Sequence, residues 1–357
     1  MLVFMKGGIL MDAMKAVELL IGRIKRDYAE DISFVVMMGS RIYQDTHPKS
    51  DVDLYYVAKT KRGENLAQVF IIDGIGFDFW CIPWERLERM AEYEENKTSI
   101  IAEGQLVYVG SEEDRKKFEQ LRKKALNTSD HWGFVCKARK QFQMVYGPYF
   151  QLIQAKNLHE ARMNAFGVLY PLTWSIALLN RDMVRRGRAK LKGELLKMPL
   201  LPDNFSALYD VVFQTRDIQT LQDAYTQLIA NMDKLIASQE EMLRPPVPFH
   251  QKLAGLYEEM INFYNKIEHY CQTGEYSGAL FAAVELTNEF DEAFCGTEVS
   301  SKELPDIVEV FDEQHIDSFL EAVQRHHRKL LEILHKKGVP IREFADYQEL
   351  ENFLNTL

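Results

Sequence analysis

Paired aspartates on one short segment are the residues of this chain whose types and spacing could do chemistry. Asp51 and Asp53 stand two apart in a stretch that predicts a strand. Because a strand repeats every two residues, both carboxylates should project from one face while the residues between them enter the core. Neighbouring carboxylates repel each other unless a positive ion lies between them. Mg²⁺ suits that place, since it takes oxygen ligands from carboxylates and triphosphates alike.

A third carboxylate, Asp78, lies in a later apolar run between Phe77 and Phe79. A lone charge on a buried strand is costly without a partner. If this strand pairs beside residues 51–57, Asp78 completes a cluster of three carboxylates. Two Mg²⁺ ions held there would activate an attacking hydroxyl and stabilise charge on a leaving pyrophosphate.

A glycine–serine pair precedes these aspartates and directly follows an apolar run over residues 32–38. Gly39 has no Cβ, so a phosphate can approach its backbone closely. Ser40 lies where a helix could begin, and unpaired N–H groups at a helix start favour an anion. Arg41, the next residue, is a candidate for contacting a phosphate or pairing with a carboxylate. We expect the outer phosphates of a nucleotide to bind here.

The order of these parts resembles the nucleotidyltransferase superfamily related to DNA polymerase beta: a strand, Gly-Ser, ten residues, Asp-x-Asp, and a later strand aspartate. The motif match covers roughly residues 31–82, and the helical remainder looks most like the antibiotic nucleotidyltransferases, which modify aminoglycosides or lincosamides. The resemblance implies that Gly39 and Ser40 hold phosphate. It also implies that Asp51 and Asp53 bind Mg²⁺, and that Asp78 is the third ligand, the general base, or both.

Two weaker candidates lie outside the motif. The first is a basic segment, residues 183–197, in an otherwise acidic chain. In the antibiotic-modifying relatives a similarly placed lysine reaches the triphosphate, and Lys190 or Lys192 would do so here; the alternative is a solvated helix end. The second is Glu103, which would act as general base if it lies within hydrogen-bond reach of the acceptor hydroxyl; the alternative is an ordinary turn residue.

The arrangement of apolar residues predicts an α+β fold. Strands are expected at 32–38, 51–57 and 106–109, with a hairpin at 68–82 around Asp73-Gly74. Helical periodicity follows at 112–126, 131–153, 157–186, 216–240, 249–273, 277–296, 312–337 and 346–356. We therefore predict a small mixed-sheet nucleotidyltransferase domain (1–126) followed by helical bundles. These are a helical domain that completes the active site (127–244) and, after the proline-rich break at 245–248, a C-terminal helical subdomain (245–357).

Bulk properties narrow the class of protein. The 357 residues carry a formal net charge of −10, which argues against nucleic acid as the partner and suits a cationic acceptor. The apolar start, residues 1–11, is too short and interrupted for a membrane span or a signal peptide. Four cysteines without metal-ligand spacing indicate a reducing cytoplasm. A homodimer is compatible with helical domains of this class.

These observations lead to one functional prediction. The chain is expected to be a Mg²⁺-dependent nucleotidyltransferase that moves a nucleoside monophosphate, AMP first among the candidates, from ATP or another nucleoside triphosphate to a hydroxyl of a small molecule such as an aminoglycoside-like antibiotic. Antibiotic resistance would be its role. The alternatives are modification of a protein or an RNA end, and a non-catalytic nucleotide-binding or antitoxin-like module. The acceptor, the nucleotide base and the choice of Asp78 or Glu103 as general base stay open.

Overall fold

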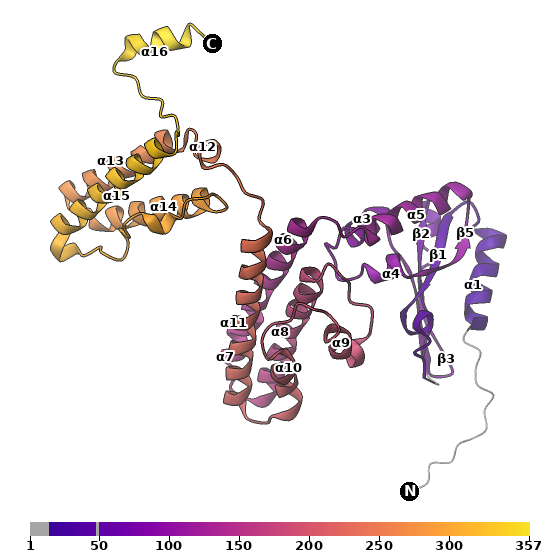
Figure 1. The fold of residues 1–357 in the computed structure, drawn as a ribbon. Helices are drawn as coiled ribbons and strands as arrows, with labels where there is room; N and C mark the ends of the chain where they lie inside the picture. The colour runs from indigo at the N-terminus through magenta and orange to yellow at the C-terminus, as the bar shows by residue number, and fades with distance from the viewer. Residues whose placement is uncertain (1–13, 48–49) are drawn as a thin grey trace. The chain divides into compact units, whose positions relative to one another are not determined.

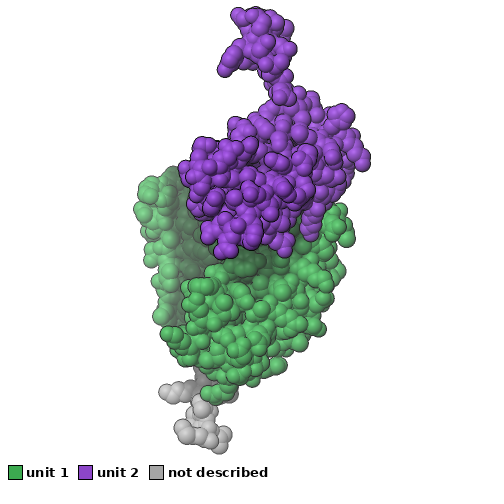
Figure 2. Space-filling view, turned by 90° about the vertical axis from the view of Figure 1, so that its left-hand side faces the viewer, with its two compact units in different colours: residues 1–243 green, residues 244–357 purple. Residues whose placement is uncertain are grey.

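The computed structural model describes residues 14–47 and 50–357. The apolar start considered above, residues 1–11, lies outside the described residues. Contacts divide the chain into two compact units, Met1–Leu243 (unit 1) and Arg244–Leu357 (unit 2); Figure 2 colours them separately. No helix in the described ranges is long and apolar enough to cross a membrane.

Unit 1 begins with a mixed five-stranded sheet in the order β3-β4-β2-β1-β5. The strands are β1 (Ile32–Met38), β2 (Asp53–Ala58), β3 (Gln68–Ile72), β4 (Ile75–Cys81) and β5 (Gln105–Val109). β2 runs parallel to β4, and the other neighbours are antiparallel. The hairpin turn between β3 and β4 places Asp73 at φ 50° and Gly74 at φ 72°, the backbone that an Asp-Gly pair favours.

Alternation along the strands gives the sheet two different faces. Val35, Leu54 and Phe79 share a core with α1 (Met14–Asp27). Phe34, Tyr55 and Trp80 point the other way, into a core that continues through the helices of unit 1. Those nearest the sheet in Figure 1 are α3 (Trp84–Ala91), α4 (Ser99–Ala102) and α5 (Glu112–Leu126). A short α2 (Lys61–Glu64) follows β2.

The rest of unit 1 is helical and shares one hydrophobic core with the second face of the sheet. Its elements are α6 (His131–Phe142), η2 (Gln143–Val145), α7 (Tyr146–Ile153), α8 (Leu158–Leu179), α9 (Arg188–Leu195), α10 (Phe205–Gln214) and α11 (Ile218–Leu243). This continuous core fixes the basic segment, which follows α8 and includes all of α9, relative to the sheet.

Unit 2 is entirely helical and has a core of its own. Its elements are α12 (Phe249–Lys252), α13 (Leu256–Thr273), α14 (Tyr276–Phe294), η3 (Ser301–Glu303), η4 (Glu313–His315), α15 (Ile316–Lys336) and α16 (Tyr347–Leu354). The core lies among α13, α14 and α15, whose apolar faces meet.

The predicted α+β class, a small mixed sheet followed by helices, is confirmed. The predicted strand at 51–57 begins two residues later, so Asp51 lies just before β2. The helix predicted over 157–186 ends at Leu179, and a separate helix, α9, follows. The three-domain division at residues 126 and 244 stays a prediction.

Candidate active site

The sheet places two of the predicted carboxylates next to each other on neighbouring inner strands. Asp53 opens β2, where it pairs in register with Asp78 of β4 on one side and Met38 of β1 on the other. Register partners on adjacent strands project from the same face. That face is the one that carries Tyr55 and Trp80 farther along, so both carboxylates lie where the covered part of the sheet ends. Asp51 lies two residues before Asp53, and Val52 between them is buried with Leu54 in the core of the opposite face.

Charge within this cluster is unbalanced. The pKa of Asp53 is raised to about 6, first by burial and then by the negative charges of Asp51 and Asp78; the charge of Lys97 opposes the rise. A carboxylate with two acidic neighbours favours a cation. Among the described residues, no group of three or more His, Cys, Asp or Glu side chains is already gathered closely enough to hold a metal ion. The metal-ligand assignment therefore stays a prediction.

Gly39 directly follows β1 and faces Asp53. Its φ is +78°, a left-handed backbone, and a Cβ built there would lie 2.1 Å from Oδ2 of Asp53. Both facts require glycine at this position. The missing Cβ was expected to admit a phosphate; in the structure the Asp53 carboxylate lies against this position.

Ser40 lies in η1 (Gly39–Tyr43), a five-residue 3₁₀ turn rather than the start of an α-helix. Such a turn supplies N–H groups but little of the dipole of a longer helix. Arg41 extends from the same turn. Its Nε donates to the carbonyl of Asp51 at 2.9 Å and its Nη2 to the carbonyl of Ser50 at 3.2 Å. Arg41 thus braces the backbone that leads into β2.

Glu103, which follows α4, is held by two donors. Tyr43 Oη donates to its Oε2 at 2.5 Å, and Arg185 Nε donates to its Oε1 at 2.5 Å. Arg186 places its guanidinium 4.3 Å from the centre of the Tyr43 ring, a cation–π contact. Burial and the hydrogen bond to Glu103 raise the pKa of Tyr43 well above its usual range. Glu103 therefore links the 3₁₀ turn to the basic segment.

The two candidate lysines point to different partners. Lys190 and Arg186 both pair with Asp45, in the loop that joins η1 to β2. Lys192 instead donates to Asp210 of α10 at 2.5 Å and lies 5.9 Å from the centre of the Tyr209 ring. Only the first of the two lysines reaches the loop beside the carboxylates.

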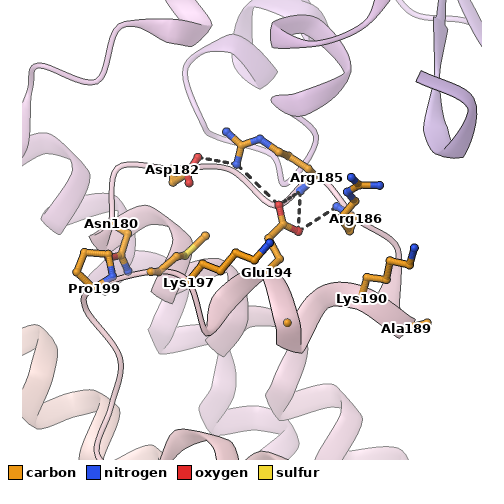
Figure 3. A pocket seen from close by; sticks show the side chains of 11 residues that line it. Asn180, Asp182, Arg185, Arg186, Ala189, Lys190, Glu194, Lys197 and Pro199 are labelled. Atoms are coloured by element: carbon orange, nitrogen blue, oxygen red, sulfur yellow. Dashed lines mark hydrogen bonds and ion pairs between the residues drawn. The ribbon is translucent and has the colours of Figure 1, made fainter. Parts of the chain in front are cut away.

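A cleft of about 770 Å³ opens over the basic segment. Figure 3 shows Arg185, Lys190 and Lys197 along it, with Glu194 directed at the backbone of residues 185 and 186. The Glu194 carboxylate accepts from both of those N–H groups. Asp51, Asp53 and Asp78 do not line this cleft; its residues Arg185 and Lys190 pair with Glu103 and Asp45 instead.

Three residues near the site had no predicted role: Tyr43, Asp45 and Lys97. Tyr43 and Asp45 fall inside the motif, but nothing in their spacing signals that their partners lie in distant segments. Lys97 comes from an exposed turn before α4 that has no periodic pattern. Its proximity to Asp53 results from the tertiary fold alone.

Comparisons with known proteins add a sequence match and a distant structural likeness. Residues 115–242 match the KNTase C-terminal domain family. No curated protein matches the chain significantly. A crystal structure of a nucleotidyltransferase-like protein from Exiguobacterium sibiricum 255-15 is similar over 72% of this chain and 92% of its own, with 14% identity and a TM-score of 0.39. The family match supports the nucleotidyltransferase superfamily for this chain.

Proposed function

We propose that this chain, whose residues 115–242 match the KNTase C-terminal domain family, transfers a nucleoside monophosphate from ATP or another nucleoside triphosphate to a hydroxyl of a small molecule. The observation that carries the proposal is the register of Asp53 with Asp78 beside a glycine that cannot be replaced without a clash. This arrangement concentrates negative charge at the point where a metal–triphosphate complex would dock.

The bond changes are those of an in-line displacement. The acceptor oxygen forms a bond to the α-phosphorus while the bond from that phosphorus to the bridging oxygen of pyrophosphate breaks. Pyrophosphate leaves with the electron pair of the broken bond, and the acceptor proton passes to a base. We assign the base to Asp78, because both oxygens of Glu103 already accept hydrogen bonds from Tyr43 and Arg185.

The residues fit a divalent cation by chemistry and by charge. Asp51, Asp53 and Asp78 offer hard oxygen donors, and burial with like-charge repulsion raises the pKa of Asp53 to about 6. Bound there, two Mg²⁺ ions would supply charge stabilisation at the reacting phosphate. Asp53 is the central residue of the three, because its neighbours in the sheet include Asp78 and its neighbours in sequence include Asp51.

The basic segment supplies the positive charge that a triphosphate needs. Lys190 and Arg186 reach Asp45 beside the Gly39–Tyr43 turn, so their heads already lie near the expected phosphate seat. Lysine acts there as a mobile point charge. We therefore assign the phosphate contact to Lys190 rather than to Lys192, which is engaged by Asp210.

The acceptor is proposed to be small and hydroxylated. The net charge of −10 favours a cationic molecule, such as an aminoglycoside-like antibiotic, over a nucleic acid. Resistance to such an antibiotic would then be the biological consequence.

The deciding experiment measures Mg²⁺-dependent pyrophosphate release from ATP and the other nucleoside triphosphates across a panel of aminoglycosides and other hydroxylated molecules. Asp53→Asn should reduce release by about a thousandfold or more, because it removes the central charge of the cluster. Asp73→Asn, in the exposed turn of the same sheet, is the matched control and should leave release unchanged. Near-normal release by a folded Asp53→Asn variant would refute the proposal.

A further inference from the structure

An apolar strip lies next to the carboxylates, on the edge strand β3. Val69 is 79% exposed and Ile71 is 76% exposed. Antiparallel pairing places Val69 opposite Asp78 and Ile71 opposite Gly76. Since register partners share a face, Val69 and Ile71 project on the side of the sheet that carries Asp53 and Asp78.

This strip is open to solvent along its length. A Cβ built on Gly76 would meet no atom within 4 Å. The other face of the same hairpin is different, because Phe70 stacks on Phe77 with ring centres 5.2 Å apart and planes 9° from parallel. One side of the hairpin is therefore packed, and the other presents β-branched side chains to water.

Exposed β-branched residues on an edge strand are a liability for a protein, since such edges pair with other chains. Charged or polar residues commonly protect edges of this kind. Here two large apolar side chains are retained next to the proposed catalytic carboxylates instead. Their position suggests that they bind something during the reaction.

The order of the strands indicates on which side of the carboxylates the triphosphate and the acceptor would each lie. From β1 outward, the sheet presents the Gly39 turn, then Asp53 on β2, then Asp78 on β4 and finally Val69 on β3. If the phosphates occupy the turn beside β1 and Asp78 takes the acceptor proton, the body of the acceptor must extend over β3. The first of these conditions rests on the function proposed above.

We propose that Val69, Ile71 and the open backbone at Gly76 form an apolar platform for the acceptor, and that the acceptor carries an alkyl or aryl group next to its reactive hydroxyl. Burial of that group against the two side chains provides affinity. The carboxylates beside the platform then receive the hydroxyl. Among cationic hydroxylated acceptors, one that carries such a group would bind more tightly than one that lacks it.

Two glucosides with the same hydroxyls test the platform. The protein is loaded with Mg²⁺ and a non-hydrolysable triphosphate analogue, and binding of radiolabelled methyl and hexyl β-D-glucoside is measured by equilibrium dialysis. We expect the hexyl compound to bind on the order of tenfold more tightly, because its longer chain covers apolar surface. A Val69→Ser/Ile71→Ser double variant should lose that preference, since both substitutions lie at exposed positions and leave the core intact.

Leu19→Ser is the matched control, because Leu19 is also an exposed apolar residue (65%) but lies on α1. It should keep the preference of the wild-type protein. The proposal is overturned if the wild-type protein shows no preference for the hexyl compound, or if the double variant retains one. Sedimentation velocity provides a further test, since a change of oligomeric state in the double variant would identify the strip as a contact between two copies of this chain and overturn the acceptor role.

These measurements are independent of turnover. Failure of the Asp53→Asn experiment would refute nucleotidyl transfer while leaving a measurable alkyl preference in place. Absence of the alkyl preference in the wild-type protein, together with normal pyrophosphate release, would refute the platform alone.

Discussion

The two units surround their ionisable groups with strongly shifted pKa values differently. In unit 1, Asp53 begins β2 beside Asp78 of β4, and its pKa is raised first by burial and then by the negative charges of Asp51 and Asp78. In unit 2, His326 is 3% exposed and its Nδ1 lies 2.7 Å from Tyr264 Oη. Its pKa falls to about 4, chiefly because burial disfavours the charged ring.

The two regions differ because one shifted group lies in a candidate active site and the other lies in a packed core. Both regions contain a strongly shifted pKa, and such shifts often mark functional sites. In unit 2 the imidazole has a hydrogen-bonding partner and aromatic neighbours, so the neutral ring is satisfied. In unit 1 the negative charges lie next to one another on an incompletely covered face, where the cation of the proposed function would balance them. Unbalanced charge beside an exposed surface, rather than the pKa shift itself, indicates a catalytic site.

The largest effect among the remaining predictions is expected at Gly39. Gly39→Ala would force a Cβ against Asp53 and strain a backbone at φ +78°. We expect transfer to fall by about a hundredfold, since a displacement of about 1 Å in a catalytic group has effects of this size. The assay is pyrophosphate release with the acceptor found in the panel.

The Gly74→Ala variant tests backbone strain alone, without the displacement of a neighbouring side chain. Gly74 also has a positive φ, +72°, but a Cβ there would meet nothing within 4 Å. This variant should lose about 1 kcal/mol of folding free energy and retain activity. If Gly39→Ala behaved as mildly as Gly74→Ala, the close approach to Asp53 would not matter for catalysis, and the contrast between the units would weaken.

A smaller effect is expected in the basic segment. Lys190→Ala should raise the dissociation constant for the metal–triphosphate complex about tenfold, because it removes one point charge from the phosphate seat. Lys192→Ala is the matched control, and we expect a change of less than about twofold, since Lys192 is directed at Asp210. Isothermal titration calorimetry with a non-hydrolysable analogue measures both. Equal losses in the two variants would refute the assignment of Lys190.

Replacing Asp45 should strengthen triphosphate binding, whereas replacing Lys190 should weaken it. It pairs with Lys190 and Arg186, and the hydrogen bond from Lys190 is the main cause of its lowered pKa. Asp45→Asn frees both cations, so triphosphate binding should tighten about threefold at low salt, within the range of exposed ion pairs. Weaker binding by this variant would instead show that Asp45 positions the basic segment.

Local patterns predicted much of the sheet and of the carboxylate cluster. The run 32–38 coincides with β1, and Asp73-Gly74 forms the predicted hairpin turn. Alternation alone predicted that Asp51 and Asp53 share a face. These features depend on neighbours in sequence, where the two-residue period and the turn chemistry act directly.

Contacts between distant segments could not be predicted in the same way. Asp45 and Lys190 are separated by 145 positions, and Tyr43 and Glu103 by 60. Their meeting depends on how the helices of unit 1 pack on the sheet, and periodicity contains no information on that packing.

The end of α8 was also missed, for a local reason. Arg181 adopts φ +53°, and the N–H of Asp182 donates to the carbonyl of Ala177 at 2.9 Å. This is the geometry of a Schellman cap, which usually places glycine at the left-handed position. Arginine at that position gives no signal in the sequence, so the helical pattern extended in prediction to residue 186.

Replacement of His326 is expected to leave nucleotidyl transfer unchanged. The prediction for this residue concerns folding stability. The folded pKa of about 4 lies below the ordinary value of 6.5. The unfolded chain therefore binds a proton first as the pH falls, and folding stability is retained above pH 6.5 and lost below it. Between pH 7.5 and pH 5 unit 2 should lose about 2 kcal/mol of unfolding free energy. His327 adds a like charge next to His326, and Asp306 partly opposes the shift.

The tryptophans make the two units distinguishable. Trp80, Trp84, Trp132 and Trp174 all lie in unit 1, and unit 2 has none. Urea unfolding of the full chain should show an acid-sensitive transition by circular dichroism that tryptophan fluorescence does not report. His326→Gln cannot acquire charge and should remove most of the acid sensitivity, whereas His335→Gln, at an exposed position of α15, should not. If His326→Gln also abolished pyrophosphate release at pH 7.5 while unit 1 stayed folded, unit 2 would take part in the chemistry and the distinction between site and core would fail.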